Sequence, residues 1–315
     1  MIDLLLGGSP CQGFSFAGKQ LNFFDPRSKL FFDYVKALET LKPRYFLLEN
    51  VKMKKEYEDI ITQHLGVKPI EINSALVSAQ NRKRLYWTNI SVPNEPKDKH
   101  IKLLDILDND VDESYFINDE TFNKLTEIKN GVISVRNLND KFLPIENGDG
   151  VILSRTWQTY MPIIKGKSHC IRAMNPNDSG VVINVDGKFR IRKFTENEVE
   201  KLQTIPINYT YGLSPLQRKK LCGNAWTVDV IAHILSFIPE TYLHTVVSLF
   251  DGISCGQVAL ERAGKIYNQY YASEIDKYAI QVAQKNYPHT MQLGDVSKID
   301  WETLEDRLNI IQKVS

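Results

Sequence analysis

Residues 245–256 read Thr-Val-Val-Ser-Leu-Phe-Asp-Gly-Ile-Ser-Cys-Gly, a short apolar strand followed by a glycine-bearing turn. Helical spacing follows over 256–263. Strand, turn and helix in this order are typical of the first unit of a doubly wound α/β sheet, where glycines let the backbone approach a ligand closely. The glycine spacing departs from G-x-G-x-x-G, so the turn predicts a cofactor site only together with its surroundings.

Two further strands are predicted over 270–275 and 291–296, and each carries a carboxylate near its end. Glu274 lies about 20 residues beyond the turn, where an acidic residue can bind ribose hydroxyls. Asp295 is placed to bind the amino group of adenine. Since ligands bind at the carboxyl ends of parallel strands, we expect a nucleoside-containing cofactor here. An ordinary α/β turn without a ligand is the alternative.

The chain begins with another predicted strand, residues 2–6, which leads into Gly-Gly-Ser-Pro and then Cys11. Pro10 fixes its own φ and helps to aim the next residue. A thiolate is well suited to attack an electron-poor ring carbon. We therefore expect Cys11 to be a nucleophile, and the other three cysteines to be packing residues: Cys170, Cys222 and Cys255.

Polar residues at the next strands add to this edge of the predicted sheet. Glu49 closes an apolar strand and should lie on the same edge as Cys11, where it can hold the ring nitrogen of a base. A helix N-cap carboxylate is the alternative. Arg82 and Arg84 precede a further strand; at i and i+2 they point to one side and can donate forked hydrogen bonds to a base carbonyl or a phosphate.

The bulk composition is that of a globular protein. The chain has 315 residues, of which 43% are hydrophobic and 24% charged, enough for one large domain and one smaller one. No apolar run approaches 18 residues, and no basic segment precedes the apolar start, so neither a membrane span nor a signal peptide is expected. Four cysteines without C-x-x-C spacing predict reduced thiols in a cytoplasmic protein and no metal site.

The alternation of strands and helices stops between about 95 and 195, where short β-prone pieces are broken by turn residues. We expect catalytic segments at 1–95 and 211–315 and a smaller β-rich domain at 96–210. Residues 105–150 hold 4 Lys/Arg and 11 Asp/Glu, whereas residues 151–220 hold 12 and 5. A basic stretch beside an acidic one suggests a local nucleic-acid face, with a solvated charged surface as the alternative.

Several motifs together resemble those of the cytosine-C5 DNA methyltransferases. Motifs IV, VI, VIII, IX and X are matched by Pro10-Cys-Gln-Gly-Phe-Ser15, Glu49-Asn-Val51, Gln80-Asn-Arg-Lys-Arg84, Arg192-Lys-Phe-Thr195 with Leu202-Gln203, and Gly223-Asn-Ala-Trp-Thr-Val228. Motifs I, II and III are matched by Phe250-Asp-Gly-Ile-Ser-Cys-Gly256, Ser273-Glu-Ile-Asp276 and Gly294-Asp-Val296. Because motifs IV to X come before I to III, the resemblance implies a circular permutation, with termini close together.

The resemblance implies a doubly wound, Rossmann-like fold and a reaction on duplex DNA. Cys11 would attack C6 of a flipped-out cytosine, Glu49 would hold N3 and the amino group, and Arg84 would hold O2. Arg82 would support the loop or contact phosphate.

The cofactor would be S-adenosylmethionine, leaving S-adenosylhomocysteine as product. Its expected binding residues are Phe250, Asp251, Gly252, Gly256, Glu274, Ile275, Asp295 and Asn224. The expected DNA-binding residues are Gln12, Ser15, Arg82, Arg155, Gln158 and Arg192.

Two other functions remain open at this point. A tRNA cytosine-C5 methyltransferase shares the cysteine and Glu-Asn-Val chemistry. An inactive DNA-binding regulator of the same fold should have lost Cys11, Glu49 or the turn glycines, and none is lost. A bacterial or phage enzyme of this kind acts either beside a separate restriction endonuclease or alone, and the sequence is compatible with both roles.

Overall fold

The computed structural model describes residues 2–10, 26–129, 132–136, 142–153, 161–304 and 306. The chain forms two compact units. Unit 1 combines Met1–Asn73, Lys83–Glu95 and Val228–Ser315, and unit 2 combines Ser74–Arg82 and Pro96–Thr227. Along the chain, the last boundary between the two units falls after Thr227, whereas the sequence predicted it after residue 210. The reason is that Arg218, in the segment between these points, bonds to Asn197 and Glu200 of unit 2.

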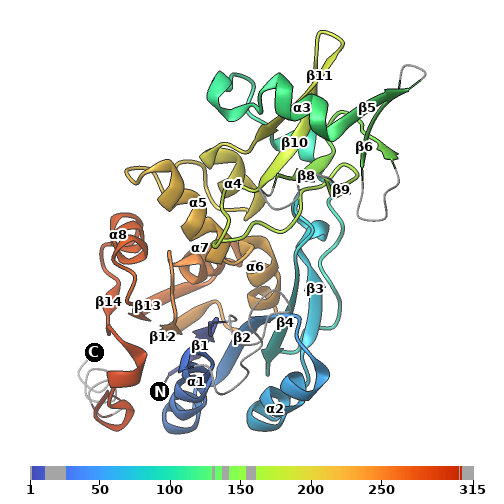
Figure 1. Ribbon diagram of the computed structural model, residues 1–315. Helices are drawn as coiled ribbons and strands as arrows, with labels where there is room; N and C mark the ends of the chain where they lie inside the picture. Colours follow the sequence, from blue (N-terminus) through green and yellow to red (C-terminus); the bar gives the residue numbers. More distant parts are fainter. Residues whose placement is uncertain are drawn as a thin grey trace. The chain divides into compact units, whose positions relative to one another are not determined.

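Unit 1 is built on a seven-stranded sheet (Figure 1). In spatial order its strands are β14 (Met291–Gln292), β13 (Ile266–Ser273), β12 (Tyr242–Leu249), β1 (Leu4–Gly7), β2 (Tyr45–Val51), β4 (Lys83–Thr88) and β3 (Ile70–Asn73). Neighbours from β14 to β2 are parallel, while β4 runs antiparallel to both β2 and β3. The predicted doubly wound α/β fold is confirmed; the reversed direction of β4 was not predicted.

Helices lie on both faces of this sheet (Figure 1). They are α1 (Pro26–Leu41), α2 (Lys55–Leu65), α6 (Val228–Ser236), α7 (Cys255–Arg262) and α8 (Lys277–Asn286). The largest side chains of the main core come from α1, the strands and the C-terminal segment: Phe31, Tyr34, Trp87, Tyr271 and Trp301. Right-handed crossovers running in opposite directions from the central strands put helices on opposite faces.

The first strand of the chain is a central strand of the sheet. Leu4–Gly7 pairs with β12 on one side and with β2 on the other, so the C-terminal strands complete the sheet that the N-terminal strands begin. Gly7 is required here because a Cβ would lie 2.6 Å from the ring of Tyr34. Ile2 and Trp301, near the two ends of the chain, belong to one hydrophobic cluster.

Unit 2 is β-rich, as predicted. One sheet has the order β11 (Lys188–Lys193), β10 (Ser179–Val185), β8 (Gly150–Ile152) and β9 (Ile163–Ile164), and a second has β5 (Thr126–Lys129), β6 (Val132–Arg136) and β7 (Phe142–Pro144). Its helices are α3 (Asp119–Leu125), α4 (Glu196–Leu202) and α5 (Pro215–Asn224). One hydrophobic cluster of unit 2 is made of Val135, Ile145, Val151, Met161, Val182 and Ile191.

Candidate functional site

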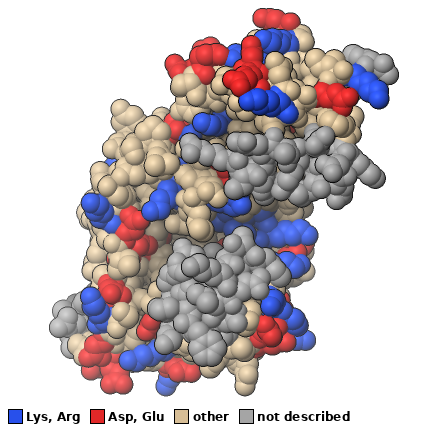
Figure 2. Space-filling model, in the orientation of Figure 1, with Lys and Arg blue, Asp and Glu red and all other residues tan. Residues whose placement is uncertain are grey.

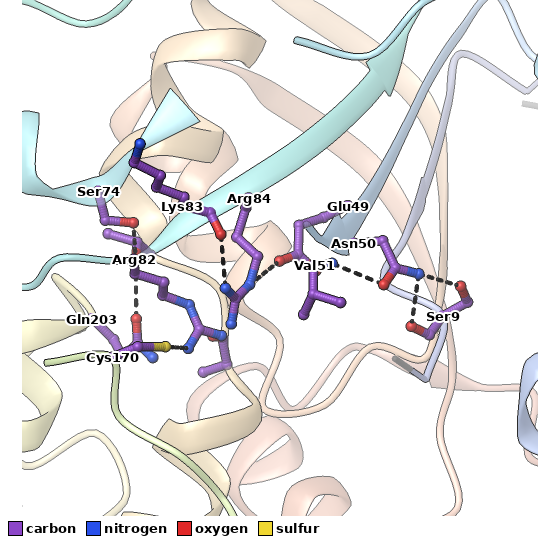
Figure 3. Close-up of polar contacts among 12 residues, drawn as sticks. Ser9, Glu49, Asn50, Val51, Ser74, Arg82, Lys83, Arg84, Cys170 and Gln203 are labelled. Carbon is purple, nitrogen blue, oxygen red and sulfur yellow. Dashed lines mark hydrogen bonds and ion pairs between the residues drawn. The ribbon is translucent and has the colours of Figure 1, made fainter. Parts of the chain in front are cut away.

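The carboxyl ends of β1 and β2 bring two polar segments of unit 1 together. Asn50 donates from Nδ2 to the hydroxyl and the carbonyl oxygen of Ser9, at 3.1 and 3.4 Å (Figure 3). Its own Oδ1 accepts from the backbone N–H of Val51 at 2.8 Å. Both Ser9 and Asn50 are buried. The backbone that leads into Cys11 is therefore fixed to the neighbouring strand, although Cys11 itself lies outside the described residues, as do Gln12 and Ser15.

Glu49 and Arg84 form an ion pair at the same edge (Figure 3). Nε of Arg84 lies 3.0 Å from Oε1 of Glu49, and the side chains are only 15% and 12% exposed. The register explains the contact, because Arg84 lies opposite Val51 and diagonally across from Glu49 on the antiparallel strands. A carboxylate and a guanidinium side by side can bind a ring that presents an N–H beside a carbonyl oxygen.

Arg82 has other partners, three of which lie in unit 2 with it. Its guanidinium donates to the carbonyl oxygens of Ile171 and Ala225 at 3.2 and 3.0 Å, and to the sulfur of Cys170 at 3.2 Å (Figure 3). The residue is buried. These bonds engage the guanidinium within the protein, and its contact with phosphate stays a prediction. Support of the loops around it is the role that fits.

Two buried amides, Gln80 and Gln203, hold the segments that resemble motifs IX and X, a role that the sequence did not predict. Gln203 donates to the carbonyl oxygen of Cys222 at 2.7 Å and accepts from the hydroxyl of Thr227 at 2.9 Å. Gln80 donates to the carbonyl oxygen of Leu202 at 2.9 Å. Asn224, at the end of α5 in unit 2, is exposed. Its cofactor role stays a prediction.

The predicted cofactor turn has an unusual backbone. Phe250, Gly252 and Ser254 have φ values of 58°, 59° and 60°, in the left-handed region that residues other than glycine seldom adopt. The N–H of Gly252 donates to Oε2 of Glu274 at 2.8 Å. Alternating left-handed residues turn backbone N–H groups toward a common side, which suits a negatively charged or oxygen-rich partner.

Glu274 stands beside this turn at the end of β13. Its Oε1 accepts from the N–H groups of Ile275 and Asp276, each at 2.8 Å. The carboxylate is thus held by backbone donors from both the turn and its own loop. Ile275 next to it is 73% exposed.

Asp251 is arranged differently from the prediction. Its side chain points into the fold and is only 8% exposed, where it accepts from the hydroxyls of Tyr270, at 2.7 Å, and Ser254. Burial raises the pKa of Asp251 to about 6. The oxygens of this carboxylate are bonded inside the unit, and the cofactor role of Asp251 stays a prediction. Gly256 is likewise buried, in the first turn of α7.

Asp295 lies shortly after β14 and is the N-cap of a short 3₁₀ helix, Val296–Lys298. Its Oδ1 accepts from the N–H and the hydroxyl of Ser297, and these bonds hold the pKa of Asp295 below its usual value. Phe250 is half-buried against the main core. The nucleoside-binding roles of Glu274, Asp295, Phe250 and Ile275 stay predictions.

Arg192 is buried and paired inside unit 2. Its guanidinium forms two hydrogen bonds to the carboxylate of Glu198, at 2.8 and 2.6 Å, and the side chain is 2% exposed. Glu198 also closes the capping box of α4 with Thr195. This pairing supports a structural role for Arg192, and its DNA-binding role stays a prediction. Arg155 and Gln158, which are also expected DNA-binding residues, lie outside the described residues.

The described part of unit 2 carries no surface of a single sign on the face drawn in Figure 2, where acidic and basic side chains are interspersed. Among the described residues, no group of three or more His, Cys, Asp or Glu side chains is arranged to hold a metal ion. In the same residues, no helix is long and apolar enough to cross a membrane.

Known proteins match most of the chain. Type II methyltransferase M.DsaV of Dactylococcopsis salina is 26% identical over 301 residues, which cover 86% of this chain and 79% of that relative. Type II methyltransferase M1.ScrFI of Lactococcus lactis subsp. cremoris is 29% identical over 256 residues, which cover 73% of this chain and 60% of that relative. The chain thus spans less than two thirds of the length of M1.ScrFI.

Among solved structures, a mutant of DNMT2 from Spodoptera frugiperda aligns with a TM-score of 0.47 at 20% identity, over 76% of this chain and 80% of that one. The family model described as C-5 cytosine-specific DNA methylase matches residues 1–240 and 244–312. That match includes the edge formed by Ser9, Glu49 and Arg84 and the turn beside Glu274. This chain therefore belongs to the family of C-5 cytosine-specific DNA methylases, which methylate cytosine in DNA.

Proposed function

We propose that this chain transfers the methyl group of S-adenosylmethionine to C5 of a cytosine that is flipped out of duplex DNA. The observation that carries the proposal is the ion pair of Glu49 and Arg84 at the sheet edge where Asn50 fixes the backbone leading to Cys11. Addition to a pyrimidine ring requires a nucleophile, an acid and a cation, and in this proposal Cys11, Glu49 and Arg84 supply them.

The roles of the residues follow from this arrangement. The thiolate of Cys11 attacks C6 and forms an S–C6 bond, while Glu49 holds N3 and the amino group and favours the protonated ring. Arg84 holds O2. The electron pair released into the ring makes C5 nucleophilic. After C5 is methylated, a water removes the C5 proton, the S–C6 bond breaks, and the thiolate and the aromatic ring are restored.

Glu274 would bind the ribose hydroxyls of the cofactor, and Asp295 would bind the amino group of its adenine. Phe250 and Ile275 would pack against the adenine ring. When bound, it supplies an electrophilic methyl group. The backbone of the turn at Gly252 and the fixed carboxylate of Glu274 support this assignment. No metal is required, since the proposed chemistry uses only the thiolate, the carboxylate and the guanidinium.

We propose, further, that the chain is circularly permuted relative to its family. The two separate matches of the family model, and the place of β1 between β12 and β2, support this. Duplex DNA is the proposed partner. The bacterial and phage sources of the relatives support a cytoplasmic enzyme, with a restriction endonuclease as a separate possible companion.

The test is transfer of labelled methyl from S-adenosylmethionine to duplex DNA and, in parallel, to tRNA. Incorporation into DNA at C5 of cytosine, with none into tRNA, is expected. Incorporation into tRNA alone would replace DNA by RNA as the substrate. Incorporation into neither would leave a DNA-binding protein that has lost its activity.

A further inference from the structure

A continuous network of buried hydrogen bonds lies beneath the cofactor turn of unit 1. Asp251 accepts from the hydroxyl of Tyr270 on β13 and from the hydroxyl of Ser254 at the start of α7. Gln257, one turn along α7, donates to the Ser254 hydroxyl at 3.1 Å and to Thr290 Oγ1 at 2.8 Å. All five residues are buried.

The network ties the turn to three separate elements. Tyr270 belongs to β13, Gln257 to α7, and Thr290 to the segment just before β14. A second tyrosine, Tyr267, donates to Oε1 of Gln257 at 2.8 Å. Each polar atom named here therefore has a partner, which is the condition under which a buried polar network defines one conformation.

The turn needs such support. Phe250 and Ser254 are not glycines, yet both have positive φ, a conformation that costs about 1 kcal/mol or more at each such residue. The strained conformation is the one that directs the N–H of Gly252 to Glu274. Interactions elsewhere must hold the backbone in this state, and the bonds to Asp251 are attached to the turn itself.

We infer that Asp251 and Tyr270 are positioning residues for the cofactor: their hydrogen bond holds residues 250–254 in the conformation that receives S-adenosylmethionine. The inference rests on the proposed function and extends it to residues that do not touch the ligand. Asp251 acts from inside the unit, through the backbone of Gly252 and through Glu274.

The test compares two tyrosines that are adjacent on β13. Tyr270→Phe removes the hydroxyl that bonds to Asp251 and keeps the ring. Tyr271→Phe is the control, because among the described residues the hydroxyl of Tyr271 bonds only to Gln269, at 3.4 Å, and its ring belongs to the main core. The dissociation constant of S-adenosylhomocysteine is measured by titration calorimetry on the full chain, and that of duplex DNA by fluorescence anisotropy. Melting temperatures show that each variant is folded.

We expect Tyr270→Phe to raise the dissociation constant of S-adenosylhomocysteine by about 3- to 10-fold, the effect of losing one buried hydrogen bond. Tyr271→Phe should leave it within about twofold, and DNA affinity should be unchanged in both. Asp251→Asn, which is isosteric but also alters the bond to Ser254, should weaken binding at least as much. In the kinetics, the KM for the cofactor should rise while kcat is retained.

Equal cofactor affinity in Tyr270→Phe and wild type would overturn the inference and leave the proposed function intact. Equal losses in the two tyrosine variants would also overturn it, because the effect would then be one of general packing. If wild type itself did not bind S-adenosylhomocysteine, the proposed function and the inference would fail together.

Discussion

Oε1 of Glu49 lies 3.0 Å from Nε of Arg84, across two antiparallel strands that lie next to each other in the sheet. Each group neutralises the charge of the other, so neither of these largely buried side chains carries an unpaired charge. The pair also holds both side chains at the carboxyl edge of β2, where Asn50 binds the backbone that leads into Cys11. Binding of a base would replace part of this ion pair with hydrogen bonds to the ring.

The acid of this pair should be essential to the reaction. Glu49→Gln keeps the shape of the side chain but cannot favour a protonated ring, so we expect kcat to fall by about 100-fold or more. The measurement is single-turnover methyl transfer to DNA. Arg44→Gln is the matched control, since Arg44 pairs with Glu240 near the opposite end of β2 and its loss should not affect kcat. Equal rates for Glu49→Gln and wild type would contradict the assignment.

Asn50 should contribute both to stability and to methyl transfer, because its side chain binds Ser9. Asn50→Ala removes the donor to two buried oxygens of Ser9, and we expect a loss of about 1–3 kcal/mol in the free energy of unfolding and slower methyl transfer. Asn89 bonds to the backbone of Phe46 and Arg44, toward the start of β2, and serves as the control. Asn89→Ala should affect stability only. Equal rates of methyl transfer for Asn50→Ala and Asn89→Ala, at equal stability, would contradict this role of Asn50.

The buried ion pair of Arg192 and Glu198 should support the structure of unit 2. Arg192→Ala leaves a carboxylate buried without its cation, and we expect a loss of about 3–5 kcal/mol, measured by urea denaturation. Arg190→Ala is the control, because Arg190 pairs with the exposed Glu113 and its removal should have little effect on stability. A stable Arg192→Ala protein with weakened DNA affinity would support the role predicted from the sequence.

Stability should depend on pH through Asp251. Burial raises its pKa from 3.8 to about 6, so the folded state binds this proton more tightly than the unfolded state does. The contribution to stability is then greatest at low pH and is lost as the pH rises from about 4 to about 6.

Asp251→Asn removes this titration. Relative to the variant, the free energy of unfolding of wild type should fall by up to about 3 kcal/mol across that range. Urea titrations of both proteins at about pH 4, 5, 6 and 7 give the difference directly. A constant difference, or one that grows with pH, would contradict the assignment.

The sequence predicted the parts of the fold that depend on apolar periodicity. Helix α1 and the central strands were found because their buried residues follow regular spacing, and the turn at Gly252 was found because glycine marks it. The antiparallel direction of β4 was not found, since a buried strand has the same pattern in either direction. The helices α4 and α5 were missed because the irregular segments around them hide their short periods.

The roles of individual residues were harder to predict than the fold. Arg82, Arg192 and Asp251 are charged, and charged side chains usually lie at the surface, so a ligand-binding role was the natural interpretation. Each is buried instead. Arg82 and Asp251 have partners that are distant in the sequence, Ala225 and Tyr270, and no local pattern reports such pairings. Arg192 pairs with Glu198, six residues away. The ion pair of Glu49 and Arg84 was not predicted either, because the antiparallel direction of β4 that brings them together was not predicted.

The most direct test of the central claim is labelled methyl transfer to mixed-sequence duplex DNA by wild type and by Cys11→Ser, followed by bisulfite sequencing. The account predicts methylated cytosines within one short sequence for wild type and none for Cys11→Ser. Methylation that persists in Cys11→Ser, or a wild type that methylates no cytosine in DNA, would contradict it.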